Sequence, residues 1–82
     1  MQERWAQNPN TEYKKKLTPR QREVLQLLAE GQTMKEAAFN LNIATRTVAF
    51  HKYKIMDDFR LRSNAELVQL AIKERILPVP AQ

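Results

Sequence analysis

The stretch ATRTVAFHKYKIMDDF, residues 44–59, decides the fold. Read as a helix, it carries Val48, Ile55 and Phe59 within one narrow arc, at spacings of 7 and 4 residues. An apolar arc of this kind is a face to bury. The opposite side presents side chains at spacings of 3 and 4: Arg46, Ala49, Phe50 and Tyr53. The pattern predicts a helix that packs against the protein along one side and is free to make contacts along the other.

Two further helices are predicted before this one. Thr18-Pro19-Arg20-Gln21 places a capping threonine before a proline at the first helical position, with a glutamine three residues after the cap. Gly31, the only glycine, is expected to end that helix because glycine adopts left-handed backbone conformations. Thr33-Met34-Lys35-Glu36 is a second capping box, and Asn42 tolerates the positive φ that ends its helix. These helices span about residues 18–30 and 33–41.

A fourth helix follows the central stretch. Ser63-Asn64-Ala65-Glu66 is a third capping box, and Pro78 and Pro80 prevent the helix from continuing. Only three residues separate Leu41 from Thr45, so the helices on either side are expected to cross steeply. Strand-like alternation is absent from the sequence, which predicts an all-α, four-helix fold. The last two helices span about residues 45–59 and 63–76.

Composition limits the classes of protein. Eighty-two residues suit one small domain, and without cysteine there is neither a disulfide framework nor a thiolate zinc site. No apolar run approaches the ~20 residues of a membrane span, and no signal-peptide pattern opens the chain. We therefore expect a cytoplasmic protein with no membrane partner. We also expect no cofactor. The net charge of +5, with a pI near 9.9, favours an anionic partner such as nucleic acid.

The two ends of the chain lack helical periodicity. Asn8-Pro9-Asn10-Thr11 is a turn signal, and Lys14-Lys15-Lys16 is a charge run. We expect residues 1–16 to be a flexible N-terminal segment or an interdomain linker, residues 17–77 to be the folded domain, and residues 78–82 to be a C-terminal tail.

Many short stretches agree, in order and spacing, with one known family. They are Leu17-Thr18-Pro19-Arg20, Glu23-Val24-Leu25, Leu28-Ala29-Glu30-Gly31, Lys35-Glu36-Ala37-Ala38, Thr47-Val48, His51, Ile55-Met56 and Ala65-Glu66-Leu67-Val68. On these residues the chain resembles the LuxR/GerE/NarL-type helix-turn-helix domain. The resemblance implies a four-helix DNA-binding domain of a bacterial transcription regulator, often the output domain of a response regulator or a quorum sensor. It also implies a dimer on inverted half-sites, paired through the last helix.

Some positions depart from that family. The family usually has serine at the position of Ala44, and we expect Thr45 to cap the helix in its place. Ala49 stands where lysine or arginine is common, and Asp57 and Asp58 stand where basic residues are common. The sequence therefore leaves the operator open, together with the controlling signal and the choice between activation and repression.

The resemblance makes the outward side of residues 45–59 the candidate base-reading surface: Arg46, Ala49, Phe50 and Tyr53. An arginine can bridge O6 and N7 of guanine. Phe50 could lie against thymine methyl groups, and Tyr53 could donate to a base or a phosphate. The alternative is that Phe50 packs sideways and that only Tyr53 is exposed.

A second group of residues is expected to contact phosphates: Thr33, Lys35, Thr45, Thr47, Lys52, Lys54, Arg60 and Arg62. Such contacts fix register without reading sequence, and each of these charges could instead be merely solvated. Asp57 opposes this picture because it lies on the groove-facing side. Either the helix end tilts away from the duplex, or Asp57 accepts a hydrogen bond from cytosine N4. Asp58 is expected to pair with Lys54.

His51 lies beside the predicted buried face and is interpreted as structural. It is the only histidine, and without cysteine it cannot build a metal site or a nucleophilic triad with the usual partners. The sequence therefore offers no catalytic constellation, and we expect no enzymatic activity.

The last helix has two apolar stripes. One stripe, Leu67, Leu70 and Ala71, is expected to face the core. The other is the candidate dimer interface: Ala65, Val68, Ile72 and Ile76. Alternatively, the N-terminal segment covers this second stripe with Trp5 or Tyr13.

We therefore expect sequence-specific binding of double-stranded DNA by a homodimer, with residues 45–59 in the major groove and residues 33–41 bracing them. RNA polymerase is a further candidate partner. One alternative is the fourth region of a sigma factor, which residues 17–31 also resemble. Another is a protein-interaction module that has lost DNA binding, which Ala49, Asp57 and Asp58 favour. The polar lead-in up to Lys16 suggests a C-terminal piece of a response regulator.

Overall fold

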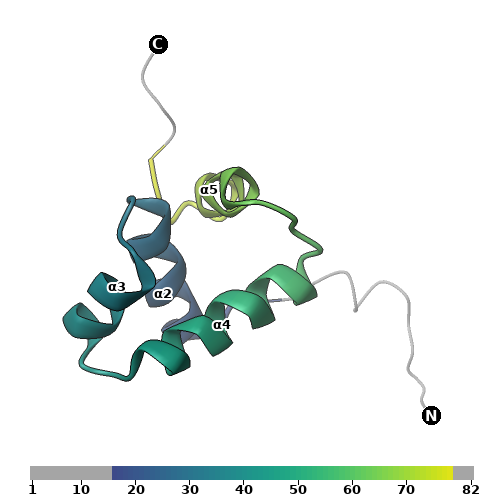
Figure 1. Cartoon of the computed structure of the whole chain (residues 1–82). Coiled ribbons are helices and arrows are strands. Elements are labelled where there is room, and N and C mark those ends of the chain that lie inside the picture. The colour runs from purple at the N-terminus through teal and green to yellow at the C-terminus, as the bar shows by residue number, and fades with distance from the viewer. Residues whose placement is uncertain (1–15, 79–82) are drawn as a thin grey trace.

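The computed structural model describes residues 16–78, and these residues form four α-helices joined by short connections (Figure 1). The helices are α2 (Pro19–Ala29), α3 (Met34–Leu41), α4 (Thr45–Asp58) and α5 (Asn64–Lys73). The predicted all-α class is confirmed, and residues 16–78 contain no strand. None of the helices in this part of the chain is long and apolar enough to cross a membrane.

The first two helices begin at complete capping boxes, as predicted. At α2, the Thr18 hydroxyl accepts from the Gln21 backbone N–H at 3.1 Å, and the Gln21 side chain accepts from the Thr18 N–H at 2.9 Å. At α3, Thr33 and Glu36 make the same pair of bonds, at 3.0 and 2.9 Å. Each cap satisfies N–H groups that the helix itself cannot, and contributes about 1 kcal/mol.

Both helices also end where left-handed backbone is available. Gly31, with φ +100°, follows the end of α2. Asn42 ends α3 with φ +59° and ψ +45°. Glycine adopts such left-handed conformations most readily, and asparagine does so more readily than most other residues. Gly31 and Asn42 therefore marked the ends of both helices in the sequence.

The starts of α4 and α5 differ from expectation. Ala44 is the N-cap residue of α4 and no side chain caps the helix; Thr45 already has helical geometry, so its hydroxyl does not replace the missing cap. At α5, the Ser63 hydroxyl accepts from the Glu66 N–H at 3.2 Å. The Glu66 carboxylate, however, accepts from the N–H of Arg62 rather than that of Ser63, so this box is half formed.

Helix α5 ends at Lys73, before the expected end near Ile76. Arg75 has φ +61°, and the Ile76 N–H donates to the Ala71 carbonyl at 2.8 Å, which closes the helix in the manner of a Schellman turn. The turn folds Ile76 back so that it packs against the core. Ile76 therefore does not extend the outward apolar stripe of α5.

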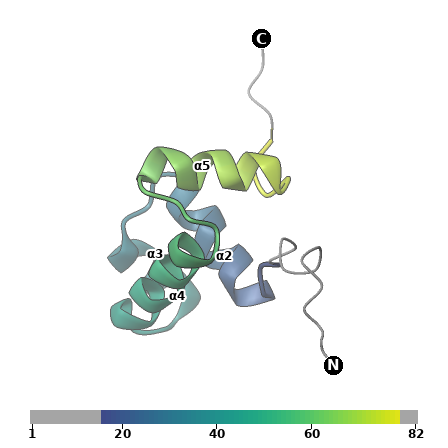
Figure 2. The same ribbon diagram turned by 90° about the vertical axis from the view of Figure 1, so that its right-hand side faces the viewer.

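The core consists of two apolar clusters that α2 joins. The first cluster contains Leu25, Ile55, Leu67, Leu70 and Ala71. The second contains Val24, Ala37, Ala38 and Val48. Because Val24 and Leu25 are adjacent on α2, they point into different clusters, and α4 contributes one residue to each. Figure 2 shows α5 on one side of the molecule and α3 with α4 on the other.

Helices α3 and α4 meet at an angle where residues 42–44 connect them (Figure 1). A connection of three residues is short for two helices laid side by side as an antiparallel pair, which is the basis on which a steep crossing is predicted. This arrangement leaves one side of α4 without a neighbouring helix.

The Ala44→Ser substitution is expected to stabilise the domain. Ala44 has the extended backbone of an N-cap residue, with φ −71° and ψ 148°, but no side chain to accept a hydrogen bond. A serine hydroxyl there can accept from an N–H in the first turn of α4, which should raise the free energy of unfolding by about 0.5–2 kcal/mol. Urea unfolding followed by circular dichroism measures the change.

The matched control is Thr33→Ala, which removes an existing cap and should lower the free energy of unfolding by a similar amount. If Ala44→Ser brings no gain while Thr33→Ala brings a loss, the first turn of α4 is already satisfied in another way.

Candidate nucleic-acid interface

Helix α4 is anchored along one side and open along the other. Val48 and Ile55 are completely buried, one in each core cluster. At 3.6 residues per turn, four residues fall within about 60° of helix surface on the opposite side. We call them the outward stripe: Arg46, Phe50, Tyr53 and Asp57. All four are exposed, so the two predicted faces of this helix are present.

The outward stripe carries two large aromatic side chains that are exposed. Phe50 is 64% exposed and Tyr53 is 56% exposed. Phe50 meets the ring of His51 edge to face, with the centroids 5.6 Å apart, but it does not pack into the core. The alternative in which Phe50 turns sideways into the protein is therefore wrong. His51 is half-buried, beside the buried face as expected, and Ala49 is half-buried at the edge of the stripe.

Two lysines of α4 lie beside the outward stripe with different partners. The Lys52 ammonium lies 5.2 Å from the centroid of the Tyr53 ring, a cation–π distance. The Lys54 ammonium lies 3.3 Å from a carboxylate oxygen of Asp58, as predicted. Exposed pairs of this kind contribute little stability. The pairing with Asp58 does, however, offset the positive charge of Lys54.

The other predicted phosphate contacts fall into separate groups. Thr33 and Lys35 are exposed at the start of α3. Thr45 is exposed and Thr47 half-buried at the start of α4, where the backbone N–H groups lack a side-chain cap. Backbone N–H groups at the N-terminus of a helix can bind anions. Arg60 and Arg62 are exposed in the connection between α4 and α5.

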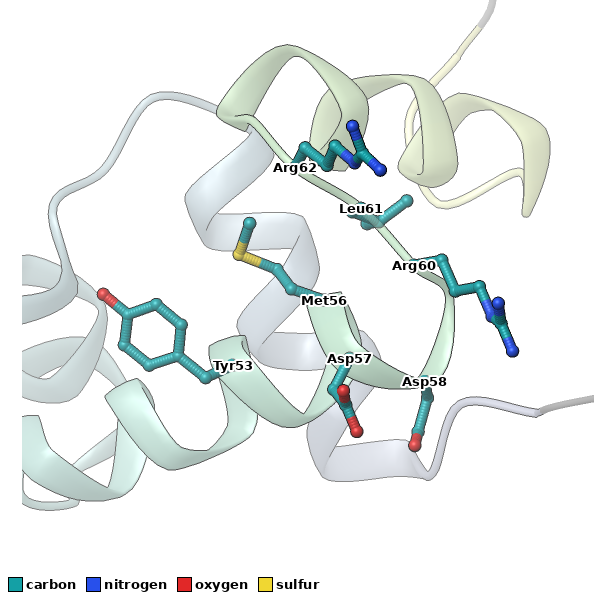
Figure 3. Close-up of a pocket in the computed structure, with 7 residues that line it drawn as sticks. All are labelled: Tyr53, Met56, Asp57, Asp58, Arg60, Leu61 and Arg62. Atoms are coloured by element: carbon teal, nitrogen blue, oxygen red, sulfur yellow. The ribbon is translucent and has the colours of Figure 1, made fainter.

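The structure brings the two acidic residues of α4 close to these two arginines. An open hollow lies between the end of α4 and the following connection (Figure 3), and it is lined by Tyr53, Met56, Asp57, Asp58, Arg60, Leu61 and Arg62. Arg60 has φ +56°, which turns the chain sharply after α4. Within residues 16–78, no ion pair joins Asp57 to either arginine.

One exposed residue was not singled out in the sequence. Phe39, on α3, is 86% exposed and lies in a shallow hollow with Lys35 and Glu36. The helical periodicity could have identified Phe39 as exposed, because Ala37 and Ala38 face the core and Phe39 lies on another side of the same helix. In the described part of the chain, no three histidine, cysteine or acidic side chains lie together as metal ligands would.

Comparison with known proteins agrees with this geometry. The family of bacterial regulatory proteins called luxR matches residues 15–71. The chain is 41% identical over 61 residues to the oxygen regulatory protein NreC of Staphylococcus carnosus (strain TM300) and to that of Staphylococcus aureus (strain JH9). The matched part covers 74% of this chain and 28% of each relative. The chain therefore belongs to the luxR family of bacterial regulatory proteins, which are DNA-binding regulators of transcription.

Proposed function

We propose that this domain binds double-stranded DNA sequence-specifically, with α4 in the major groove and α3 braced across the backbone. The observation that carries the proposal is the outward stripe. An arginine and two large aromatic side chains are exposed on a helix whose opposite face is completely buried. Exposed apolar groups that gather on one surface indicate a contact site.

The dimensions of α4 suit a groove. Tyr53 lies seven positions after Arg46, which is about 10 Å along the helix axis. The major groove of B-DNA is about 12 Å wide and admits an α-helix, whose diameter with side chains is about 10–12 Å. A helix lying in the groove can therefore turn Arg46, Phe50 and Tyr53 towards base edges together. In this proposal Arg46 donates to guanine, Phe50 contacts thymine methyl groups, and Tyr53 donates to a base or to a phosphate at the edge of the groove.

Contacts to phosphates would supply much of the affinity. Thr33 and Lys35 lie at the start of α3, where the helix N-terminus favours an anion. Thr45 and Thr47 occupy the same position on α4, and Lys52 flanks the outward stripe. Lys54, Arg60 and Arg62 complete the proposed set. The net charge of +5 adds a long-range attraction to the duplex.

The direct test is selection from a random DNA library, followed by anisotropy titration of the selected duplex at several salt concentrations. Sequence-specific binding predicts an enriched motif. It also predicts an association constant that falls with salt, with a logarithmic slope of about −0.9 for each phosphate neutralised. Steep salt dependence without enrichment would mean that the domain contacts only the backbone, and lack of binding at low salt would refute the proposal.

The Arg46→Ala substitution is expected to remove a base contact. The loss of discrimination at one base pair of the selected site should be about 1–3 kcal/mol, since a bidentate arginine–guanine pair provides that much. Anisotropy titration of the selected duplex and of single-base variants measures it. Arg22→Ala, an exposed arginine on α2, is the charge-matched control. Equal losses in the two variants would show that Arg46 contributes charge alone.

We further propose a homodimer that pairs through α5. Leu67, Leu70 and Ala71 are buried in the core, whereas Val68 and Ile72 remain half-buried and Ala65 is exposed. These last three residues recur at spacings of 3 and 4, which places them on one side of the helix. Two-fold pairing there would present two α4 helices to successive turns of DNA, and so favour an inverted repeat. Trp5 and Tyr13, the alternative cover for this surface, lie outside the described residues.

The Val68→Gln substitution should weaken the dimer without unfolding the domain, because Val68 is only half-buried. The dissociation constant of the dimer is expected to rise by about fivefold or more, as for truncation of an interface residue worth ~1 kcal/mol. Sedimentation equilibrium measures it. Phe39→Gln also replaces an apolar side chain with glutamine, at an exposed position on α3, and should leave the dimer intact. A dimer unaffected by Val68→Gln would exclude this surface.

A protein-interaction module is the second candidate function. The exposure of Phe39, at 86%, favours it, as do the acidic residues Asp57 and Asp58 on α4. RNA polymerase is one candidate partner. Expression of the target genes in cells that carry Arg46→Ala distinguishes the two functions. A DNA-binding regulator loses both regulation of these genes and affinity for DNA, whereas a protein-interaction module keeps its regulatory effect.

A further inference from the structure

Asp57 is the last residue of the outward stripe, on the face where a DNA-binding helix would be expected to avoid negative charge. We propose that Asp57 is an affinity-limiting residue: it repels phosphates at the edge of the groove and so weakens binding to DNA of every sequence. This inference rests on the proposed DNA-binding function. It assigns to Asp57 a role distinct from reading a base.

The position of Asp57 along α4 places it beyond the base-reading residues. Asp57 lies eleven positions after Arg46, about 17 Å along the helix axis, and about one turn beyond Tyr53 near the end of α4. If Arg46, Phe50 and Tyr53 occupy the groove, Asp57 reaches its rim. The rim is formed by phosphates, which in duplex DNA provide one negative charge per ~1.7 Å of helix axis.

Asp57 also faces outward. On a helical projection it lies opposite the buried Val48 and Ile55, between Tyr53 and Phe50 in angle. Its side chain is exposed, and Figure 3 shows the carboxylate directed away from α5. The same face that carries the aromatic side chains to the duplex therefore carries this charge to it.

Asp57 carries a negative charge that has no ion-pair partner among residues 16–78. Asp58, in contrast, has Lys54 as its partner, at 3.3 Å. In Figure 3, Arg62 extends along α5 and Arg60 extends on the other side of Asp58. Asp57 also lies in the last turn of α4, where the helix dipole adds negative potential.

Such a charge would matter most for unrelated DNA. A genome offers very many non-specific sites, and electrostatic attraction supplies nearly all of the affinity for them. A repulsion that acts on every sequence lowers occupancy of those sites. Binding at a true site is retained because the base contacts of the outward stripe, doubled in a dimer, outweigh it.

The test compares the unaltered chain with Asp57→Asn, which removes the charge and keeps the shape. The selected duplex and a scrambled duplex are titrated by anisotropy at about 50 mM salt, close to the conditions in which surface charges interact strongly. Asp57→Asn should tighten binding to both duplexes by about the same factor, roughly twofold to fivefold, as for an exposed charge interaction. The logarithmic salt slope should steepen by up to about 0.9.

Glu23→Gln is the matched control. It makes the same change of charge on α2, away from the outward stripe, although Glu23, unlike Asp57, forms an ion pair, with Arg20 at 3.1 Å. Its effect on DNA affinity should be much smaller than that of Asp57→Asn. Equal effects would overturn the inference, because net charge and not position would then be responsible. Circular dichroism establishes that both variants are folded.

The remaining outcomes are also decisive. If the unaltered chain binds no duplex, the proposed function fails and this inference fails with it. If the chain binds but Asp57→Asn has unchanged affinity, the end of α4 lies away from the phosphates and only this inference is refuted. If Asp57→Asn weakens binding, or changes the preferred base at one position, Asp57 accepts a hydrogen bond from a base and is not repulsive.

Discussion

The burial of Val48 and Ile55 beneath α4 is the constraint on which the rest of the structure depends. These side chains enter two different apolar clusters, which α2 joins through the adjacent residues Val24 and Leu25. Complete burial of each such side chain contributes roughly 1.5–3 kcal/mol. Because α4 is held at two points a helical turn or more apart, its rotation about its own axis is fixed, and so is the identity of the side chains that face outward.

Charge, in contrast, is distributed unevenly along the same helix. Arg46 lies in the first turn of α4 and Lys35 in the first turn of α3, and helix N-termini of this kind suit phosphate. Lys52 and Lys54 lie in the second half of α4. The last turn carries Asp57 and Asp58, and within the described part of the chain a lysine pairs with Asp58 but not with Asp57. The fold tolerates this pattern because these groups are at the surface. In the proposed complex, the N-terminal half of α4 enters the groove and the acidic last turn lies beside the phosphates at its edge.

The helices were predictable from the sequence because their signals are local. Thr18 and Thr33 cap through backbone N–H groups three residues away, and Gly31 and Asn42 end helices through their own backbone conformation. The predicted details that were wrong depend on which of several nearby backbone N–H groups a side chain contacts. The Glu66 carboxylate accepts from the N–H of Arg62 and not from that of Ser63. Thr45 is the first helical residue of α4 and not its N-cap.

The sequence by itself determined the all-α class, the four helices, the buried and outward faces of α4 and the resemblance to a DNA-binding family. Hydrophobic periodicity and caps act within a few residues, and so they can be read along the chain. Only the tertiary structure decided that Phe50 stays exposed, that Ile76 folds back onto the core, and that Asp57 shares a hollow with Arg60 and Arg62 without pairing. Those outcomes depend on packing and connection geometry between elements, which no local pattern encodes.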